Sequence, residues 1–293
     1  MIVRVLFIVN PVAGNGKAIR EWESVSVILK KKFSNYDVIF TERPGHATEI
    51  ARKASSEGYE IVAACGGDGT LNEVINGLVE TGIKAAFVPL GTGSDFGKTI
   101  GVRDVETSIE TLLEGKSKKM DVGRATFDDS GESRFFMNVL EIGFGARVME
   151  YVNSHEKGGR YTFILGVFSV LRKLKAFNVT LETDGKSETK TIEIIVANGK
   201  YFGGGMLASP ASSTDDGLLD LHILKPVSRL TTIFRLRNLM NGSYIEKGFS
   251  LESRITSARF QEKGILVEMD GEVVGKTPVS VSVVNEAINF IIP

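Results

Sequence analysis

Apolar runs alternate with amphipathic segments through the first part of the chain, and this alternation constrains the fold more than any other feature. Ile2–Val9, Glu60–Cys65 and Ala85–Pro89 are apolar at successive positions, as in strands buried on both faces. Between the last two runs, one helix face is marked by Leu71, Val74, Ile75, Leu78 and Val79. Strand–helix alternation at this spacing predicts a parallel sheet with right-handed crossovers. Its other elements are expected at Glu21–Phe33, Asp37–Thr41, Ala47–Ser56 and Val105–Leu113.

The second half is richer in strands. Asp184-Gly185 and Asp270-Gly271 are hairpin-turn dipeptides between strand-like flanks, and helices are expected near Arg160–Lys175 and Ser228–Met240. β-Branched runs occur at Val179–Thr183, Thr191–Ala197, Leu218–Leu224 and Val279–Val284. Since 293 residues suit about two domains of ~150 residues, we expect an α/β domain over 1–125 and a strand-rich β-sandwich over 126–293. The final strand could return to the first domain.

Composition and charge exclude several classes of protein. The net charge is −1, so no global basic field exists to hold nucleic acid, and nucleic-acid partners are not expected. Cys65 is the only cysteine, which rules out an internal disulfide and fits a reducing compartment. No apolar run approaches the ~20 residues of a spanning helix, and the first residues resemble a buried strand rather than an export signal. We therefore expect a cytoplasmic protein.

Three glycine loops follow strands of the predicted sheet. Gly66-Gly67-Asp68-Gly69-Thr70 lies between a buried strand and an amphipathic helix, where backbone N–H groups and the helix N-terminus can hold a phosphate. Thr70 and Glu73 have the capping-box spacing, which predicts the start of that helix. A carboxylate at Asp68 makes electrostatic sense beside phosphates if Mg²⁺ lies between them. The alternative is a plain glycine turn with a solvated aspartate.

The other two loops are Asn10–Lys17, after the first strand, and Gly91–Asp95, after the fourth. Neither has the Walker spacing or the dinucleotide glycine fingerprint, and each alone is weak evidence because glycine loops commonly only turn the chain. Together, at the same sheet edge, they favour a nucleotide or phosphate site.

These motifs carry a resemblance to a known family. GGDGTLNEV, preceded by NPVAGNGK and followed by GT-x-x-DF, resembles the diacylglycerol kinase catalytic family, and most closely its soluble bacterial lipid kinases. The resemblance continues through Asp121, Asn198-Gly199 and Ser209-Pro210-Ala211 to DGLLD at Asp216–Asp220 and DGE at Asp270–Glu272. GGDGT alone is shared with NAD kinases and, loosely, phosphofructokinases, which implies a first domain of that type.

The resemblance implies particular site residues. ATP is expected against the two glycine loops and two threonines: Asn10, Pro11, Val12, Ala13, Gly14, Thr41, Gly66, Gly67, Asp68, Gly69, Thr70, Leu71, Asn72 and Thr92. Aspartates joined through water and Mg²⁺ in the family match Asp68, Asp95, Asp121 and Asp270, and a structural Mg²⁺ site matches Ser213, Asp216 and Leu218. Ser94 departs from the family, where the residue before Asp-Phe is usually Asn, so nucleotide contacts there are in doubt.

Glu272 matches the general base of the family, with Asp68 and Asp270 beside it in the catalytic set. By itself, a glutamate next to the Asp270-Gly271 turn is usually only a solvated charge. Phosphoryl transfer to an alcohol nevertheless gives a carboxylate a task, since it can orient the hydroxyl and accept its proton late in the reaction. The expected active site therefore draws on both halves of the chain.

Other residues receive plainer interpretations. The apolar segment Arg160–Lys175 could lie at a membrane interface, but a helix apolar on most sides is more often buried, and we expect it in the core. His46, His155 and His222 lack ligand spacing for zinc. His46 is expected to start a helix, and Cys65 to be a small buried hydrophobe.

The sequence therefore predicts an ATP- and Mg²⁺-dependent kinase that phosphorylates a lipid hydroxyl at a membrane surface, with diacylglycerol as leading acceptor and phosphatidic acid as product. Sphingoid bases, ceramide, monoacylglycerol and phosphatidylglycerol remain open as acceptors. One alternative is a kinase of a soluble substrate such as NAD, and another is a nucleotide-binding regulator without turnover. Similar bacterial enzymes form homodimers, so a dimer is possible.

Overall fold

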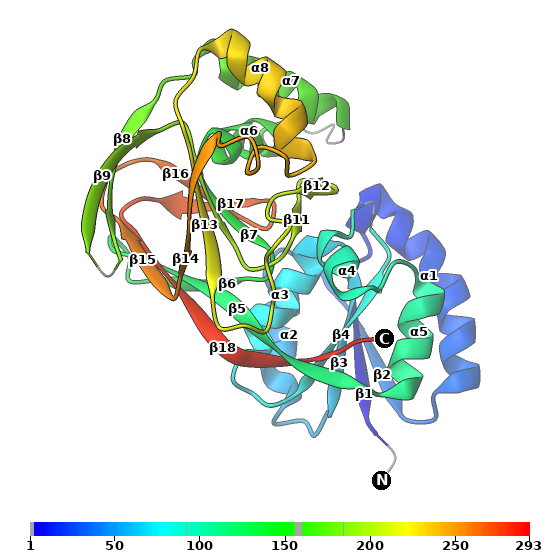
Figure 1. Cartoon of the computed structure of the whole chain (residues 1–293). Helices are drawn as coiled ribbons and strands as arrows, with labels where there is room; N and C mark the ends of the chain where they lie inside the picture. Colours follow the sequence, from blue (N-terminus) through cyan, green and yellow to red (C-terminus); the bar gives the residue numbers. More distant parts are fainter. Residues whose placement is uncertain (1–2, 92, 156–159, 184) are drawn as a thin grey trace. The chain divides into compact units, whose positions relative to one another are not determined.

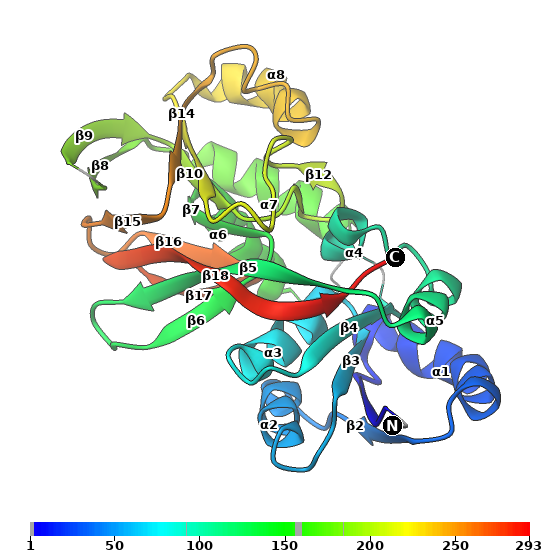
Figure 2. The same cartoon turned by 60° about the horizontal axis from the view of Figure 1, so that its bottom comes forward.

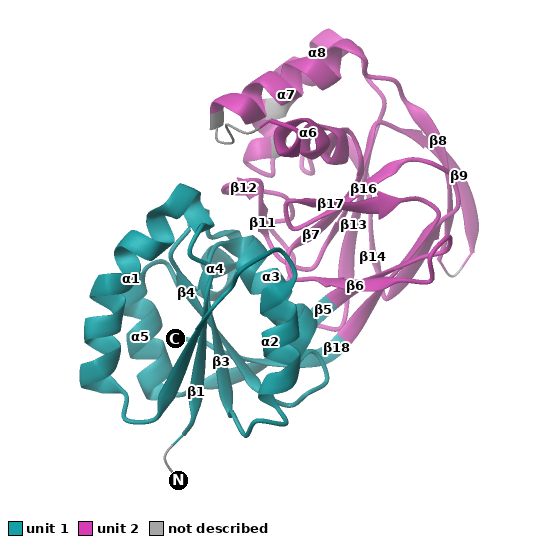
Figure 3. Ribbon diagram, turned by 180° about the vertical axis from the view of Figure 1, so that it is seen from behind, with its two compact units in different colours: residues 1–122, 285–293 teal, residues 123–284 magenta. Residues whose placement is uncertain are grey.

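The computed structural model describes residues 3–91, 93–155, 160–183 and 185–293, which form two compact units (Figure 3). Unit 1 comprises Met1–Val122 and Asn285–Pro293, and unit 2 comprises Gly123–Val284. The chain passes between them within two strands, β5 (Ser117–Phe127) and β18 (Val279–Ile291). Figure 2 shows β18 along its length beside β5, with which it pairs. The expected boundary near residue 125 lies within β5.

Unit 1 is built on a parallel sheet, which confirms the predicted α/β class. Hydrogen bonding follows the order β2-β1-β3-β4-β18, and the first four of these strands are parallel (Figure 1). The strands are β1 (Val5–Val9), β2 (Tyr36–Phe40), β3 (Ile61–Gly66) and β4 (Lys84–Pro89). The helices are α1 (Ala13–Lys32), α2 (His46–Ala54), α3 (Asp68–Leu78), α4 (Asp95–Ile100) and α5 (Val105–Glu114).

Helices cover both faces of the unit 1 sheet (Figures 1 and 3). On one face, α1 and α5 bury Trp22, Leu29 and Ile109 against side chains of β1, β3 and β4. On the other, α2 and α3 pack so closely that a Cβ at Gly77 would lie 2.6 Å from the Thr48 carbonyl oxygen. Cys65 is fully buried, as expected, and burial raises the pKa of its thiol.

Two predictions for the helices of unit 1 need correction. The first helix begins at Ala13 rather than near Glu21, but Gly14–Gly16 within it have left-handed φ values, so its regular part starts after this segment. The capping box at Thr70 and Glu73 is wrong, because α3 starts earlier, at Asp68, without a side-chain cap. The Glu73 carboxylate instead accepts the backbone N–H groups of Gly45 (2.9 Å) and Ala47 (3.1 Å) at the start of α2.

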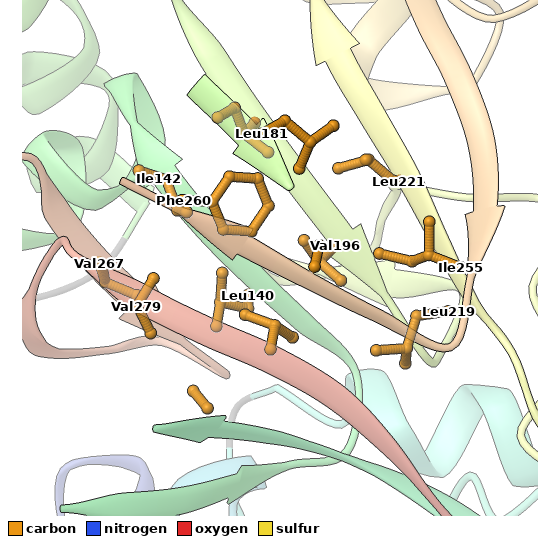
Figure 4. Packing of buried hydrophobic residues seen from close by; sticks show 14 of the residues in the cluster. Leu140, Ile142, Leu181, Val196, Leu219, Leu221, Ile255, Phe260, Val267 and Val279 are labelled. Carbon is orange, nitrogen blue, oxygen red and sulfur yellow. The ribbon is translucent and has the colours of Figure 1, made fainter. Parts of the chain in front are cut away.

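Unit 2 contains a sandwich of two antiparallel layers, which confirms the strand-rich prediction. One layer is the six-stranded sheet β14-β13-β10-β7-β16-β17, and the other follows β18-β15-β8-β9, with β5 paired to β6. Figure 4 shows side chains from both layers meeting, among them Leu140, Val196 and Leu221 from the first and Phe260 and Val279 from the second. This apolar cluster is the core of unit 2.

The strands of the six-stranded sheet are β7 (Val139–Gly143), β10 (Glu193–Ala197), β13 (Leu219–Leu224), β14 (Ser250–Ile255), β16 (Leu266–Met269) and β17 (Glu272–Lys276). The remaining strands of unit 2 are β6 (Ser133–Phe136), β8 (Phe177–Glu182), β9 (Lys186–Thr191), β11 (Tyr201–Phe202), β12 (Met206–Leu207) and β15 (Ser257–Phe260). Both expected hairpins form, β8–β9 and β16–β17; Asp184 in the first turn lies outside the described residues.

The described residues of unit 2 form three helices, which are α6 (Phe144–Asn153), α7 (Arg160–Arg172) and α8 (Arg229–Met240). Val167 and Leu171 of α7 are buried against α6, but Tyr161, Leu165 and Phe168 are exposed. The expectation that this segment lies in the core is therefore wrong for half of its surface. Among the described residues, no helix has the length and apolar character needed to cross a bilayer.

Three buried glutamates lie on the face of the six-stranded sheet that points away from the sandwich core. Glu268 of β16 is directly opposite Glu141 of β7, while Glu193 of β10 pairs with Gly143, two residues further along β7. Each side chain is at most 5% exposed. Burial raises the pKa of all three carboxyl groups, that of Glu141 to about 7, because the charged form loses its hydration.

These raised pKa values predict that stability falls as pH rises. The folded chain retains protons that the unfolded chain loses above its glutamate pKa of about 4.3, so the free energy of unfolding decreases from about pH 4.5 to beyond pH 7. We expect Glu141→Gln to match the wild type near pH 4.5 and to be more stable by roughly 1–3 kcal/mol at pH 8. Urea unfolding across this range measures the effect, with exposed Glu188→Gln as control. If the free energies of unfolding of Glu141→Gln and wild type differ by the same amount at every pH, the prediction is contradicted.

Candidate functional site

The carboxyl ends of four parallel strands in unit 1 meet at one sheet edge. Val9, the last residue of β1, is opposite Phe40 of β2 and Cys65 of β3, and Gly66 is opposite Pro89 of β4. The loops that start at Asn10, Thr41, Gly67 and Leu90 therefore leave the same edge, where α/β proteins bind ligands. Both glycine loops and Thr41, expected to contact the nucleotide, are brought together here.

Glycines allow these loops to approach closely. A Cβ at Gly91 would lie 2.8 Å from the Cα of Gly67, and a Cβ at Gly14 would lie 3.3 Å from the Cα of Gly91. The first and third loops are also joined by side chains, since Asn10 Nδ2 donates to Thr70 Oγ1 at 3.0 Å. A side chain at Gly91 would push against the backbone of Gly67, so packing requires glycine at position 91.

Asp68 fixes the loop after β3 to the loop after β4. Its Oδ2 accepts the backbone N–H of Asp95 at 3.0 Å, and its Oδ1 accepts that of Phe96 at 3.1 Å. Burial, together with the nearby charge of Asp95, raises the pKa of this carboxyl, while the two N–H groups oppose that shift. Because a carboxylate offers about four lone-pair sites, two hydrogen bonds leave room for a water molecule.

The start of α3 can receive an anion. Leu71 N–H donates to Gly67 O at 3.1 Å, and the N–H groups before it belong to the helix start, where no intrahelical acceptor is available. Thr70 and Leu71 are themselves buried, so any contact of this helix start with an anion would be made through backbone N–H groups and not through their side chains. The helix dipole adds a partial positive charge at the same place.

The remaining predicted residues of unit 1 take several positions. Pro11, Ala13 and Asn72 are half-buried, and Val12 and Gly69 are exposed. Asp95 pairs with Lys98 at 3.0 Å, and Asp121 Oδ1 accepts the Glu286 N–H at 2.8 Å. The Ser94 hydroxyl is buried and points towards Gly97, where a Cβ would lie 2.0 Å from it. Thr92 lies outside the described residues.

In unit 2, Asp270 holds a tight turn in place. Asp270 and Gly271 both have positive φ, and they connect Met269 of β16 to Glu272 of β17. The Asp270 carboxylate accepts N–H groups from Met137 (2.7 Å), Asn138 (2.9 Å) and Val139 (3.0 Å). This aspartate therefore attaches the turn to the beginning of β7.

Glu272, two residues later, is exposed. Its side chain is 67% exposed, and its ion pair with Arg134 is long, 3.8 Å between Oε2 and Nη1. Arg134 makes a shorter ion pair, 3.0 Å, with Glu132. The turn thus presents a carboxylate to solvent on a backbone held by Asp270 and by the bond from Gly271 N–H to Glu268.

The residues expected around a structural metal ion lie in the loop before β13. The Asp216 carboxylate accepts the Leu218 N–H at 3.1 Å and pairs with Arg254. Arg254 also reaches Asp220 at 3.5 Å. The guanidinium supplies the positive charge that a metal ion would bring, so a divalent cation at Asp216 would compete with Arg254.

Metal-binding side chains are sparse in the described part of the chain. No group of three or more His, Cys, Asp or Glu side chains there could hold an ion. Magnesium, however, is usually bound through one or two carboxylates together with waters and substrate phosphates. Asp68 and Asp95, whose charges interact at the sheet edge, form a carboxylate pair of this kind.

Sequence reasoning did not identify Asn138. Its N–H donates to Asp270, its carbonyl oxygen accepts N–H groups from Asn198 (2.8 Å) and Gly199 (2.9 Å), and its buried Oδ1 has no partner among the described residues. A Cβ at Gly199 would lie 2.5 Å from this Oδ1. An asparagine placed just before a buried strand was the available signal.

Comparisons with known proteins match both units. Residues 4–125 match the model of the diacylglycerol kinase catalytic domain, and residues 138–292 match the YegS C-terminal NAD kinase beta sandwich-like domain. The second model alone covers more than half of the chain.

Similar proteins are matched over nearly their whole length. A diacylglycerol kinase of Mycobacterium tuberculosis (strain H37Rv) is 25% identical over 100% of this chain and 96% of its own. A diacylglycerol kinase of Staphylococcus aureus (strain MRSA252) is 28% identical, over 94% of this chain and 88% of its own. A crystal structure from Bacillus anthracis str. Sterne superposes with a TM-score of 0.81 at 25% identity, covering 99% of this chain and 95% of that one.

The close approach of the glycine loops predicts that Gly91→Ala destabilises unit 1. The added methyl would overlap the backbone of Gly67, which cannot rotate away, and we expect a loss of about 1–3 kcal/mol in urea unfolding. Gly69→Ala is the matched control, because a Cβ there meets no atom within 4 Å and Gly69 lies in α3. Equal stability of the two variants would contradict the packing argument.

Proposed function

This chain belongs to the diacylglycerol kinase catalytic family, and on that premise we propose that it transfers the γ-phosphate of ATP to the hydroxyl of a lipid. Diacylglycerol is the proposed acceptor, and phosphatidic acid the product. Relatives named diacylglycerol kinase support this choice, since they align over almost the entire chain. The observation that carries the proposal is the assembly of glycine loops at one sheet edge, locked by Asp68.

We assign ATP to the edge formed by the loops after β1, β2, β3 and β4. The N-terminus of α3 fits the triphosphate, because its N–H groups and dipole favour a multiply charged anion. Gly14, the first residue of the left-handed segment, lies beside Gly91, and we assign its backbone N–H to the same anion site. Amides fixed by packing need no reorganisation when negative charge is redistributed during transfer.

We assign magnesium binding to Asp68 and Asp95, together with the phosphates of ATP. When bound there, Mg²⁺ would neutralise negative charge on the phosphates and help to orient the γ-phosphate for transfer. The Asp68 carboxylate contributes through the lone pairs that its two backbone N–H donors leave free.

Glu272 is the proposed general base. Its carboxylate is exposed and only weakly paired, so it can accept a hydrogen bond from an alcohol, orient it and take its proton late in the reaction. Asp270 acts differently: its three N–H donors commit it to holding the turn, and it positions Glu272.

Glu272→Gln tests this assignment. We expect kcat for lipid phosphorylation to fall about 100-fold or more, because Gln cannot accept the proton. The KM for ATP and the free energy of unfolding should stay close to wild type, since Glu272 is exposed. Steady-state assays with labelled ATP and diacylglycerol in mixed micelles measure the effect.

Glu132→Gln is the matched control, because Glu132 is the other carboxylate paired with Arg134. It should retain wild-type turnover. If Glu272→Gln also keeps more than half of the wild-type kcat, Glu272 is not the base.

A further inference from the structure

The exposed face of α7 is apolar. Tyr161, Ile164, Leu165 and Phe168 are 74%, 43%, 42% and 52% exposed. Their spacing of three, one and three residues places them on one side of the helix. Val167 and Leu171, on a neighbouring side of the helix, are buried in the cluster that contains Phe144 and Val148 of α6. The helix is therefore held in the fold by one apolar face while a second remains in solvent.

Helix α8 repeats this pattern. Leu230, Ile233 and Phe234 are 71%, 38% and 79% exposed, and Arg237 continues the same face. Thr232 and Arg235, on the other side, line a pocket against Glu141 and Glu193. With Met240, the two helices contain eight of the fifteen large apolar side chains that are exposed in the described part of the chain.

Positive charge accompanies the apolar side chains. Segments 157–181 and 221–245 contain nine of the 35 Lys and Arg residues and none of the 36 Asp and Glu residues. Exposed members in the described ranges are Arg172, Lys173, Lys175, Lys225, Arg229 and Arg237, and no ion pair holds any of them there. Arg172, Arg229 and Arg237 lie on the two helices, and the three lysines lie within four residues of a helix end. A chain with a net charge of −1 therefore has a local excess of cations at α7 and α8.

The two helices cover the same end of the six-stranded sheet. Leu224 and Val227 pack against the apolar cluster shared by α6 and α7, and both also line the pocket beneath α8. Figures 1 and 3 show α6, α7 and α8 gathered at this end of unit 2. We call the exposed faces of α7 and α8, with their cations, the α7–α8 surface.

We propose that the α7–α8 surface docks unit 2 onto an anionic phospholipid bilayer. Its aromatic and aliphatic side chains would enter the boundary between head groups and acyl chains, and its cations would contact lipid phosphates. At 13 and 12 residues, the helices are too short to cross a bilayer and suit an orientation in its plane. The inference builds on the proposed lipid kinase activity, because it names where the enzyme meets its substrate, but docking is measurable without catalysis.

Charge distinguishes a bilayer from a second copy of the chain. In a two-fold symmetric dimer through this surface, the cations of one copy would face the same cations of the other, with no acidic residue in either helix to compensate. An anionic bilayer supplies the opposite charge. Its surface is also deformable, so apolar side chains that project to different heights from α7 and α8 can all enter it.

Sedimentation with vesicles tests the proposal. We expect the full chain to bind vesicles that contain phosphatidylglycerol at least tenfold more tightly than vesicles of phosphatidylcholine alone. Phe168→Ser combined with Phe234→Ser should weaken binding at least tenfold, while Arg172→Gln combined with Arg237→Gln should reduce the preference for phosphatidylglycerol and its salt dependence. Leu113→Ser combined with Leu251→Ser is the control, because these side chains are 45% and 48% exposed elsewhere.

Each result has one consequence. The proposal is overturned if the wild-type chain does not bind phosphatidylglycerol vesicles. It is also overturned if the Phe168/Phe234 variant binds them as tightly as the wild type. A wild-type dimer that this variant converts to a monomer in light scattering also overturns it and assigns the surface to a second copy. Binding to vesicles by a chain that phosphorylates no lipid would refute the proposed function and leave the docking surface in place. If both hold, the Phe variant should keep its activity on a short-chain diacylglycerol dissolved as monomers.

Discussion

The Asp68 carboxylate, bound by the N–H groups of Asp95 and Phe96, is the interaction on which the arrangement of unit 1 depends most. It connects the start of α3 to the start of α4, and so fixes the loop after β3 relative to the loop after β4. The same two loops also approach closely at Gly67 and Gly91, where a Cβ on Gly91 would lie 2.8 Å from the Cα of Gly67. Main-chain amides at this edge are therefore held in place before any ligand arrives, which is the condition for electrostatic stabilisation of a phosphoryl group.

Unit 2 uses an aspartate in a similar way. Asp270 is satisfied by three backbone N–H groups and fixes a two-residue turn, while its neighbour Glu272 points into solvent. The two carboxylates of the DGE motif thus have separate tasks, one structural and one available for chemistry. Glu268, which accepts the Gly271 N–H, belongs with Glu141 and Glu193 to a buried cluster in which desolvation raises the pKa of each carboxyl group.

The fold class could be predicted because its signals are local. Runs that are apolar at every position, such as Val5–Val9, have few alternatives to a strand buried on both faces, and DG turns mark hairpins. The glycine loops could be predicted in the same way, because backbones that approach closely need glycine, and several glycines after a strand are visible in the sequence. The roles of Asp68 and Asp270 as acceptors of distant N–H groups leave no such trace, because their partners lie 27 and about 130 positions away.

Where prediction was wrong, a tertiary contact had replaced a local one. Glu73 has the spacing to cap its own helix, but its carboxylate caps α2 instead, because the two helices pack at Gly77. The segment at α7 has the composition of a core helix, yet only one of its faces meets α6. Helical periodicity alone cannot distinguish an apolar face covered by protein from one that is left exposed.

The most direct test of the account is to identify the product. Purified chain is incubated with γ-labelled ATP, Mg²⁺ and an equimolar mixture of diacylglycerol in mixed micelles and NAD, and the labelled products are separated by chromatography. The account predicts label in phosphatidic acid and none in a nucleotide product. Label in NADP, or ATP bound without transfer to either acceptor, would contradict it.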